Sequence, residues 1–179
     1  MSEKKLLVFS DSHGDVSAVK AVFAWAVDHL PPKDSICTVA FCGDGLADLQ
    51  QAADATGFYS DWKLVGGNND YSFSLASSTV FDFADHRFFM CHGHRHNIYS
   101  NFHTLAAAGR ASEADIVLFG HAHVPVKYTE DGILIVNPGS ISRPRSKVGA
   151  TFAVIECGEK VDVVFYGIIG RGLIREVKI

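Results

Sequence analysis

The chain of 179 residues has no long hydrophobic run. Its first apolar stretch, residues 6–9, gives way at once to Ser10 and Asp11, so it is too short for the core of a signal peptide. No other run approaches the roughly 20 apolar residues that a transmembrane helix needs. We therefore expect a cytoplasmic protein without a membrane partner.

The sequence also has few cysteines and no excess of positive charge. Cys37, Cys42, Cys91 and Cys157 show no CxxC spacing, which argues against a zinc ribbon. Lysine and arginine together number 16 against 20 aspartates and glutamates, a formal net charge of −4. Because polynucleotide binding needs a basic surface, we expect no tight polynucleotide binding, and a nuclease is disfavoured.

What the sequence does contain is enough apolar material for a substantial core. Hydrophobic residues make up 47% of the chain, and this length suits one domain spanning residues 1–179. No repeat, low-complexity region or linker divides it. We therefore expect a single domain.

Short apolar runs alternate with segments whose apolar residues recur at helical spacing. The runs predict strands at residues 5–9, 35–42, 61–65, 79–83, 87–91, 116–119, 126–129, 133–136, 151–156 and 161–166. The helical segments are residues 16–30, 46–56 and 101–114. Asp48 and Asp54 fall on the expected solvated face of the second helix. Early strands that alternate with helices predict an α/β fold with parallel pairing.

Potential metal ligands follow five of these runs, each at the point where the run ends. They are Asp11 with His13, Asp44, Asn68, His92, and His121 with His123. Parallel strands bring their ends to one sheet edge, so the ligands should converge there. Three oxygen donors and four imidazoles are too many for one tetrahedral zinc, but they suit two metals that share a carboxylate.

Two further histidines extend the fourth group. In His92-Gly93-His94-Arg95-His96, we expect at most His92 and His94 to face the cleft, and His96 to point to solvent. One histidine at such a place is more often an ordinary polar residue than a ligand. The proposal of a metal centre therefore depends on all five groups together.

The five groups also carry a family resemblance. Asp11-Ser12-His13, Gly43-Asp44, Gly67-Asn68, His92-Gly93-His94 and Gly120-His121-Ala122-His123 occur in the order typical of calcineurin-like metallophosphoesterases. The short length and the Asn137-Pro138-Gly139-Ser140 loop resemble the small bacterial and archaeal phosphodiesterase branch. The resemblance implies an α/β fold built as a four-layer α/β/β/α sandwich of two mixed sheets flanked by helices.

The resemblance further implies a dinuclear metal centre. Matched by motif, the first metal would be bound by Asp11, His13 and His123, the second by Asn68, His92 and His121, and Asp44 would bridge the two. The implied activity is hydrolysis of small phosphodiesters by attack of a metal-bridging hydroxide, with phosphomonoesterase activity left open. Manganese is the metal we expect, while zinc, iron and nickel also suit this mixture of donors.

The sequence departs from the broader family at Asn69, where many relatives carry a histidine that protonates the leaving oxygen. Asparagine cannot supply that proton near neutral pH. His94 is the substitute donor we predict beside Asp44 and Asn68 as catalytic residues, although a histidine exposed to solvent or merely supporting a ligand fits equally well. Asn69 and Arg143 are candidate substrate contacts. For Asp70, orientation of a ligand and a local turn are both open.

The resemblance leaves a second function open. The retromer subunit that resembles this branch uses the same fold chiefly as a protein-interaction scaffold, with altered metal-site residues. Because every matched ligand position here carries a competent ligand, catalysis is favoured. The expected partner is a small phosphoester, with nucleotide-derived compounds among the candidates. Exposed apolar edge strands would also be compatible with a homo-oligomer.

Overall fold

The computed structural model describes residues 4–30, 38–71, 74–170 and 172–179. Two mixed β-sheets dominate it. The six-stranded sheet has the order β11-β10-β9-β1-β2-β3, and the five-stranded sheet has the order β4-β5-β6-β8-β7. The first contains β1 (Lys4–Phe9), β2 (Thr38–Phe41), β3 (Asp61–Leu64), β9 (Ala150–Cys157), β10 (Val161–Ile169) and β11 (Leu173–Val177). The second contains β4 (Ser78–Phe83), β5 (His86–Cys91), β6 (Ile116–Phe119), β7 (Pro125–Glu130) and β8 (Ile133–Pro138).

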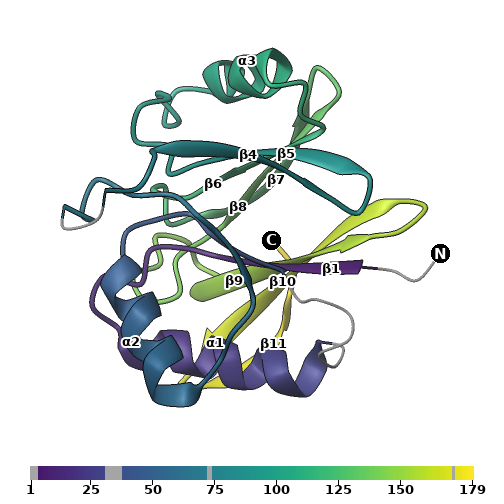
Figure 1. Cartoon of the computed structure of the whole chain (residues 1–179). Helices are drawn as coiled ribbons and strands as arrows, with labels where there is room; N and C mark the ends of the chain where they lie inside the picture. The colour runs from purple at the N-terminus through teal and green to yellow at the C-terminus, as the bar shows by residue number, and fades with distance from the viewer. Residues whose placement is uncertain (1–3, 31–37, 72–73, 171) are drawn as a thin grey trace.

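Helices cover the outer faces of the two sheets (Figure 1). Helices α1 (Val16–His29) and α2 (Leu46–Thr56) lie on the six-stranded sheet, and α3 (His103–Ala111) lies on the five-stranded sheet. The predicted four-layer α/β/β/α sandwich is therefore confirmed. No helix in the described segments is long and apolar enough to cross a membrane.

The alternation of side chains along β1 shows how one strand joins two layers. Leu7 and Phe9 pack toward α1 and α2, whereas Leu6 and Val8 belong to the core between the sheets. All four side chains are fully buried. A third cluster, which includes Leu105 and Val117, fills the space under α3. A strand buried on both faces reads as a continuous apolar run, which is why β1 was readable from sequence.

Parallel pairing sets where the strands end. Strand β1 pairs in parallel with β2, and β2 with β3; in the other sheet β5 pairs in parallel with β6, and β6 with β8. The connections through α1, α2 and α3 return the chain to the start of the next strand. The carboxyl ends of each parallel set therefore share one edge of their sheet.

Several predicted boundaries differ from those observed. Strand β11 was missed because Arg175 and Glu176 interrupt its apolar pattern, and it pairs only at the sheet edge with β10. Helix α3 begins at His103 rather than residue 101, and it ends at Ala111, since Glu113 adopts a positive φ of 54°. Of the strand predicted at 35–42, residues 35–37, including Cys37, lie outside the described residues.

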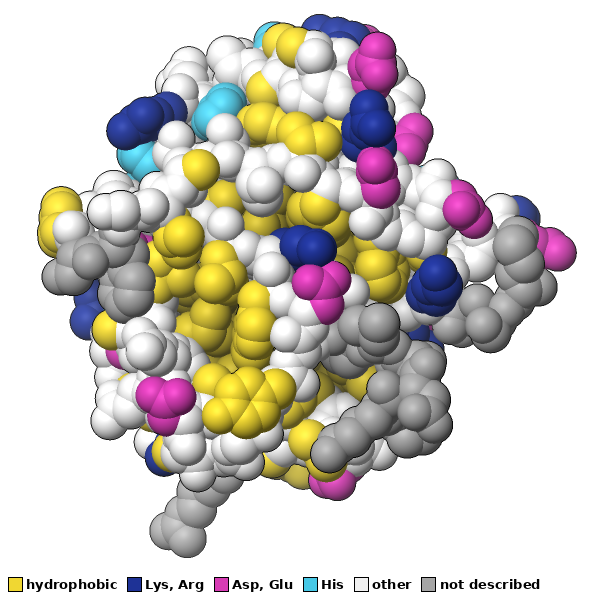
Figure 2. All heavy atoms as spheres, viewed as in Figure 1, with side chains coloured by type: hydrophobic (Ala, Val, Ile, Leu, Met, Phe, Trp, Pro, Cys, Tyr) yellow, Lys and Arg dark blue, Asp and Glu magenta, His cyan; other side chains and the backbone are white. Residues whose placement is uncertain are grey.

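One face of the molecule carries an apolar surface. Figure 2 shows hydrophobic side chains gathered over the region where the edge strands β3 and β4 lie. Tyr59, just before β3, is 77% exposed, and Val80 of β4 is 46% exposed. The ammonium of Lys63 lies 5.8 Å from the ring centre of Phe81 and so connects the two sheet edges. The homo-oligomer expected from such edges stays a prediction.

Candidate metal centre

The predicted ligands meet between the ends of the two sheets. Asp11 and His13 follow β1, Asp44 follows β2 and Asn68 follows β3, all from the six-stranded sheet. His92 follows β5, and His121 and His123 follow β6 of the five-stranded sheet. The prediction that these residues converge on a single sheet edge was wrong in this respect, because the ligands come from two sheets that face each other.

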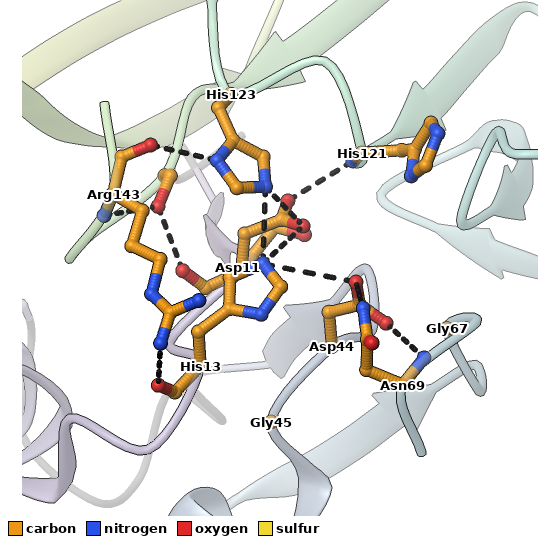
Figure 3. A network of polar contacts seen from close by, with 12 residues as sticks. Asp11, His13, Asp44, Gly45, Gly67, Asn69, His121, His123 and Arg143 are labelled. Atoms are coloured by element: carbon orange, nitrogen blue, oxygen red, sulfur yellow. Dashed lines mark hydrogen bonds and ion pairs between the residues drawn. The ribbon is translucent and has the colours of Figure 1, made fainter. Parts of the chain in front are cut away.

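The first group consists of Asp11, His13 and His123, whose ligand atoms all lie within 4.8 Å of one another (Figure 3). Oδ1 of Asp11 lies 3.2 Å from Nε2 of His123 and 3.6 Å from Nε2 of His13. The two Nε2 atoms are 3.0 Å apart. Oδ1 of Asp11 is buried without a hydrogen-bond partner in the described part of the chain. A cation among these three atoms would satisfy that oxygen.

The second group consists of Asp44, His92 and His121, again within 4.8 Å. Nε2 of His92 lies 3.3 Å from Oδ2 of Asp44 and 3.2 Å from Oδ1 of Asn68, so Asn68 adds an amide oxygen to this group. The same Oδ2 of Asp44 lies 3.7 Å from Nε2 of His13. Asp44 therefore faces both groups at once, as a shared carboxylate must.

The outer nitrogens of two histidines fix which atoms face the centre. Nδ1 of His92 donates to the carbonyl of Cys42 at 2.7 Å, and Nδ1 of His123 donates to the carbonyl of Arg143 at 2.6 Å. This assignment leaves the Nε2 lone pair of each neutral ring directed into the centre. An imidazole held by a backbone carbonyl in this way is the usual arrangement of a metal-binding histidine.

The electrostatics favour positive charge at the centre. Burial raises the pKa of Asp44, but His92 and the hydrogen bonds from Asn69 together outweigh burial and hold this pKa well below its ordinary value. The pKa of Asp11 is also lowered overall. Burial alone would raise this pKa, but neighbouring groups, chiefly His123 and His13, lower it by more. Burial lowers the pKa of His92, but Asp44, Asp11 and the carbonyl of Cys42 together raise it above its ordinary value. The oxygens that favour a proton on His92 also suit a metal cation, which would replace that proton.

Five of the candidate ligands sit on unusual backbone. Positive φ angles occur at Asp11 (58°), His13 (44°), Asp44 (60°), His121 (63°) and His123 (58°). This left-handed region is uncommon for residues other than glycine and marks functional sites when the surroundings enforce it. Strands β1, β2 and β6 are thus each followed by an abrupt turn that carries candidate ligands.

Two glycines allow the close approach of these turns. A Cβ atom on Gly67 would lie 2.1 Å from Oδ1 of Asp44, and one on Gly120 would lie 2.2 Å from Oγ of Ser10. Both distances are far inside van der Waals contact. The glycine that precedes Asn68 and the glycine that precedes His121 are therefore required by space.

Asp70 holds the Asp44 turn in place. Its carboxylate accepts four backbone N–H bonds of 2.7 to 2.9 Å, from Asp44, Gly45, Leu46 and Gly67. Gly45 is the N-cap of α2 and has no side chain to cap the helix, so Asp70 performs that task from another loop. Asp70 thus accepts both from the backbone of the candidate ligand Asp44 and from Gly67 inside its own turn, while its effect on a bound metal stays a prediction.

Asp48 corrects a prediction. We expected it on the solvated face of its helix, but it is buried, and its Oδ2 accepts from Oγ of Ser12 at 2.6 Å and from the N–H of Gly14 at 2.8 Å. These two residues flank His13. Helical periodicity could not reveal this role, because the covering loop comes from a distant part of the sequence. Asp54, by contrast, is exposed as predicted.

Residues 137–142, at the end of β8 and directly after it, support the turns that carry the candidate ligands. Oγ of Ser140 donates to the carbonyl of Asp11 at 2.7 Å, and the Asn137 amide donates to the carbonyl of Gly120 at 2.8 Å. Oγ of Ser142 donates to the carbonyl of Ser12 at 2.8 Å. In the sequence, residues 137–140 indicated a resemblance to one branch of the family, but they did not indicate these hydrogen bonds.

The remaining candidate residues surround the metal ligands. Asn69 donates to both oxygens of Asp44, from its backbone N–H at 2.8 Å and its amide at 2.6 Å. Nη2 of Arg143 donates to the carbonyl of His13 at 3.2 Å, and its side chain is exposed. Whether either residue contacts substrate stays a prediction.

His94 and His96 lie in different environments. The ring centre of His94 is 5.4 Å from that of His92 and 6.1 Å from that of His121, so it borders the second group. Burial and the nearby His92 lower its pKa. The prediction that His96 points to solvent was wrong: its partly buried ring packs on the edge of Phe89, and its Nδ1 lies 3.8 Å from Sγ of Cys91.

The family model for the calcineurin-like phosphoesterase superfamily domain matches residues 5–160. A probable metallophosphoesterase of Bacillus subtilis, YsnB, is 25% identical over 167 residues, which cover 93% of this chain and 92% of YsnB. The crystal structure of a protein from Streptococcus pneumoniae, described as a predicted phosphoesterase, has a TM-score of 0.77 and 30% identity, covering 99% of this chain and 98% of that one.

The wild-type Vps29 of Entamoeba histolytica, in complex with zinc, has a TM-score of 0.73 and 20% identity, and the alignment covers 98% of each chain. At that identity the likeness concerns the fold alone. The family match covers most of the sequence and includes every group of ligands described above. This chain therefore belongs to the calcineurin-like phosphoesterase superfamily.

Proposed function

We infer that this protein is a phosphodiesterase that hydrolyses small phosphodiesters with the help of two divalent cations. The observation that carries this inference is the position of Asp44, whose Oδ2 lies 3.3 Å from Nε2 of His92 in one group and 3.7 Å from Nε2 of His13 in the other. A carboxylate placed between two sets of ligands is the arrangement that two neighbouring cations require.

The donor set fits such cations. Asp11, His13 and His123 would hold the first cation, Asn68, His92 and His121 the second, and Asp44 both. Mixed oxygen and imidazole donors suit manganese, zinc, iron or nickel, and manganese is our first choice. When bound, two such cations attract phosphate oxygens, lower the pKa of a water molecule and stabilise the charge of an in-line displacement.

The chain itself contributes orientation. Asn69 occupies both Asp44 oxygens with hydrogen bonds of 2.8 and 2.6 Å, which fix the carboxylate plane. Arg143 lies on the carbonyl of His13 and retains guanidinium donors that can hold a phosphate oxygen at the mouth of the centre. This is the substrate contact we assign to Arg143.

His94 is the proton donor that we propose for the leaving oxygen. It borders the second group, and its Nδ1 has no hydrogen-bond partner among the described residues. An imidazole at this position can pass a proton to the leaving oxygen, and burial lowers the pKa of this one. His94→Ala should therefore slow the hydrolysis of phenyl esters more than that of p-nitrophenyl esters, whose leaving group departs unaided. Equal losses for both would remove His94 from the mechanism.

The test of the proposed function compares metals and substrates. Purified protein stripped with EDTA is reloaded with Mn²⁺, Zn²⁺, Fe²⁺ or Ni²⁺, and kcat/KM is measured for bis(p-nitrophenyl) phosphate and for p-nitrophenyl phosphate. We expect hydrolysis of the diester to exceed that of the monoester and to depend on metal.

The matched variants are Asp44→Ala and Asp54→Ala, of which only the first should lower kcat/KM, by at least about a hundredfold. Full activity of Asp44→Ala would refute the shared carboxylate. A protein that binds no transition metal and hydrolyses neither ester would support the interaction-scaffold alternative.

A further inference from the structure

An exposed tyrosine stands beside the second group of ligands. The side chain of Tyr99, in the turns between β5 and α3, is 66% exposed, yet its ring centre lies 5.8 Å from that of His121. Its hydroxyl donates to the carbonyl of His121 at 3.4 Å. Because no core packing explains its place, the ring offers a free aromatic face at the edge of the centre.

An arginine shares the hydroxyl of this tyrosine. Nη1 of Arg145 donates to Oη of Tyr99 at 3.1 Å, and the backbone N–H of Arg145 donates to the carbonyl of His123 at 3.0 Å. The backbone hydrogen bond positions the Cα of Arg145, and the bond to Tyr99 positions its guanidinium group. One guanidinium edge stays available for a ligand.

The charge of Arg145 is not compensated within the described residues. Arg87 pairs with Asp82 and Arg110 with Asp131, but no carboxylate among the described residues lies within ion-pair distance of Arg145. A protein with a net charge of −4 thus places an unpaired cation next to an aromatic ring at the edge of its phosphate site. Guanidinium groups in such positions bind phosphate well.

We propose that Tyr99 and Arg145 form a subsite for one ester group of the substrate, and that this group is a nucleotide. Its planar base would stack on Tyr99, and a further phosphate would bind the guanidinium of Arg145. The proposal rests on the proposed function and narrows it, from small phosphodiesters in general to diesters that carry a nucleobase and a second phosphate.

The first arm of the test measures kcat/KM for two dinucleotides, thymidylyl-thymidine with and without a 5′-phosphate. The wild-type protein should prefer the phosphorylated form by about tenfold, and Arg145→Ala should abolish that preference. Arg175→Ala, an exposed arginine on β11, is the matched control and should retain the preference. An unchanged preference in Arg145→Ala would overturn the role of this residue.

The second arm separates stacking from mere support of the loop. Tyr99→Phe keeps the ring and loses the hydroxyl, whereas Tyr99→Leu loses both. We expect Tyr99→Phe to stay near the wild type and Tyr99→Leu to lose about tenfold in kcat/KM for both dinucleotides, with Tyr59→Leu as the exposed control. Equal losses in both Tyr99 variants, accompanied by weaker metal binding, would mean that Tyr99 only braces His121, and would overturn the subsite.

A binding measurement distinguishes failure of the subsite from failure of the proposed function. Thymidine 3′,5′-bisphosphate is titrated calorimetrically into metal-loaded wild-type protein and into Arg145→Ala. If no phosphoester is hydrolysed, the proposed function fails, but an affinity about tenfold lower in Arg145→Ala would still support the subsite. If hydrolysis is observed and the affinities are equal, the proposed function stands and the subsite is refuted.

Discussion

The substitution Asp70→Asn replaces one oxygen of the carboxylate that holds the Asp44 turn by hydrogen bonds. Oδ1 of Asp70 accepts from Gly45 and Leu46, and Oδ2 accepts from Asp44 and Gly67. The amide of asparagine can replace only one of these oxygens. Retention of the Oδ1 pair would turn the new NH₂ group toward the N–H groups of Asp44 and Gly67, where two donors would face each other.

The size of the effect follows from the two lost bonds. A hydrogen bond to a charged group contributes about 1.5 kcal/mol or more, so the loss of two lowers the free energy of unfolding by about 3 kcal/mol. For a chain of this length, this corresponds to a fall in Tm of roughly 6 to 12 °C. Because Asp70 is only 9% exposed, water cannot readily replace the missing acceptor.

The assay is urea unfolding followed by circular dichroism, with Asp54→Asn as the control on an exposed position of α2. Metal affinity, measured by competition with a chelator, should fall in the Asp70 variant alone, since its turn no longer fixes Asp44. If Asp70→Asn remained within about 0.5 kcal/mol of the wild type and bound metal equally well, the support role would be refuted.

Three further predictions use other features of the site. Gly67→Ala should lower metal binding by the second group, because it adds an atom 2.1 Å from Oδ1 of Asp44. Gly57→Ala, in open space beyond α2, should leave metal binding unchanged. Equal metal content in the two variants would contradict the spatial argument. His123→Ala should weaken the first site more than the second in a two-site metal titration, and equal loss would show that the division between sites is too sharp. Burial raises the pKa of Cys91 to about 12 and that of Cys157 to about 11, so little thiolate is present at pH 8. Both thiols should therefore react with a disulfide reagent only after unfolding. Rapid labelling of the folded protein would disprove their burial.

Strands that are buried on both faces could be predicted from the sequence. A strand that forms mainly through backbone pairing with its neighbour could not. Strand β1 was readable from its unbroken apolar run, whereas β11 forms through backbone bonds to β10 although charged residues interrupt its pattern. The candidate ligands were recognised because each group follows a short apolar run and because the five groups occur in the order typical of the family. Their separation into two sheets needed the three-dimensional arrangement.

The supporting residues were harder to predict than the ligands. Asp48 and Asp70 look like ordinary helix and turn residues in sequence, and only the packed structure brings the β1 turn onto Asp48 and the Asp44 turn onto Asp70. Hydrogen bonds between loops distant in the chain leave no local periodicity. The positive φ angles of the ligands were likewise invisible, because aspartate and histidine occupy ordinary backbone in most contexts.

The five positive φ angles of the candidate ligands set stability against metal binding. Left-handed backbone costs a residue other than glycine on the order of 1 kcal/mol, so glycine at any of these positions would relieve strain. A chain with no metals to bind could replace Asp11, His13, Asp44, His121 or His123 with glycine and remove this strain. This chain retains a side chain at all five positions, and so keeps the strained residues that a purely structural protein would be free to discard.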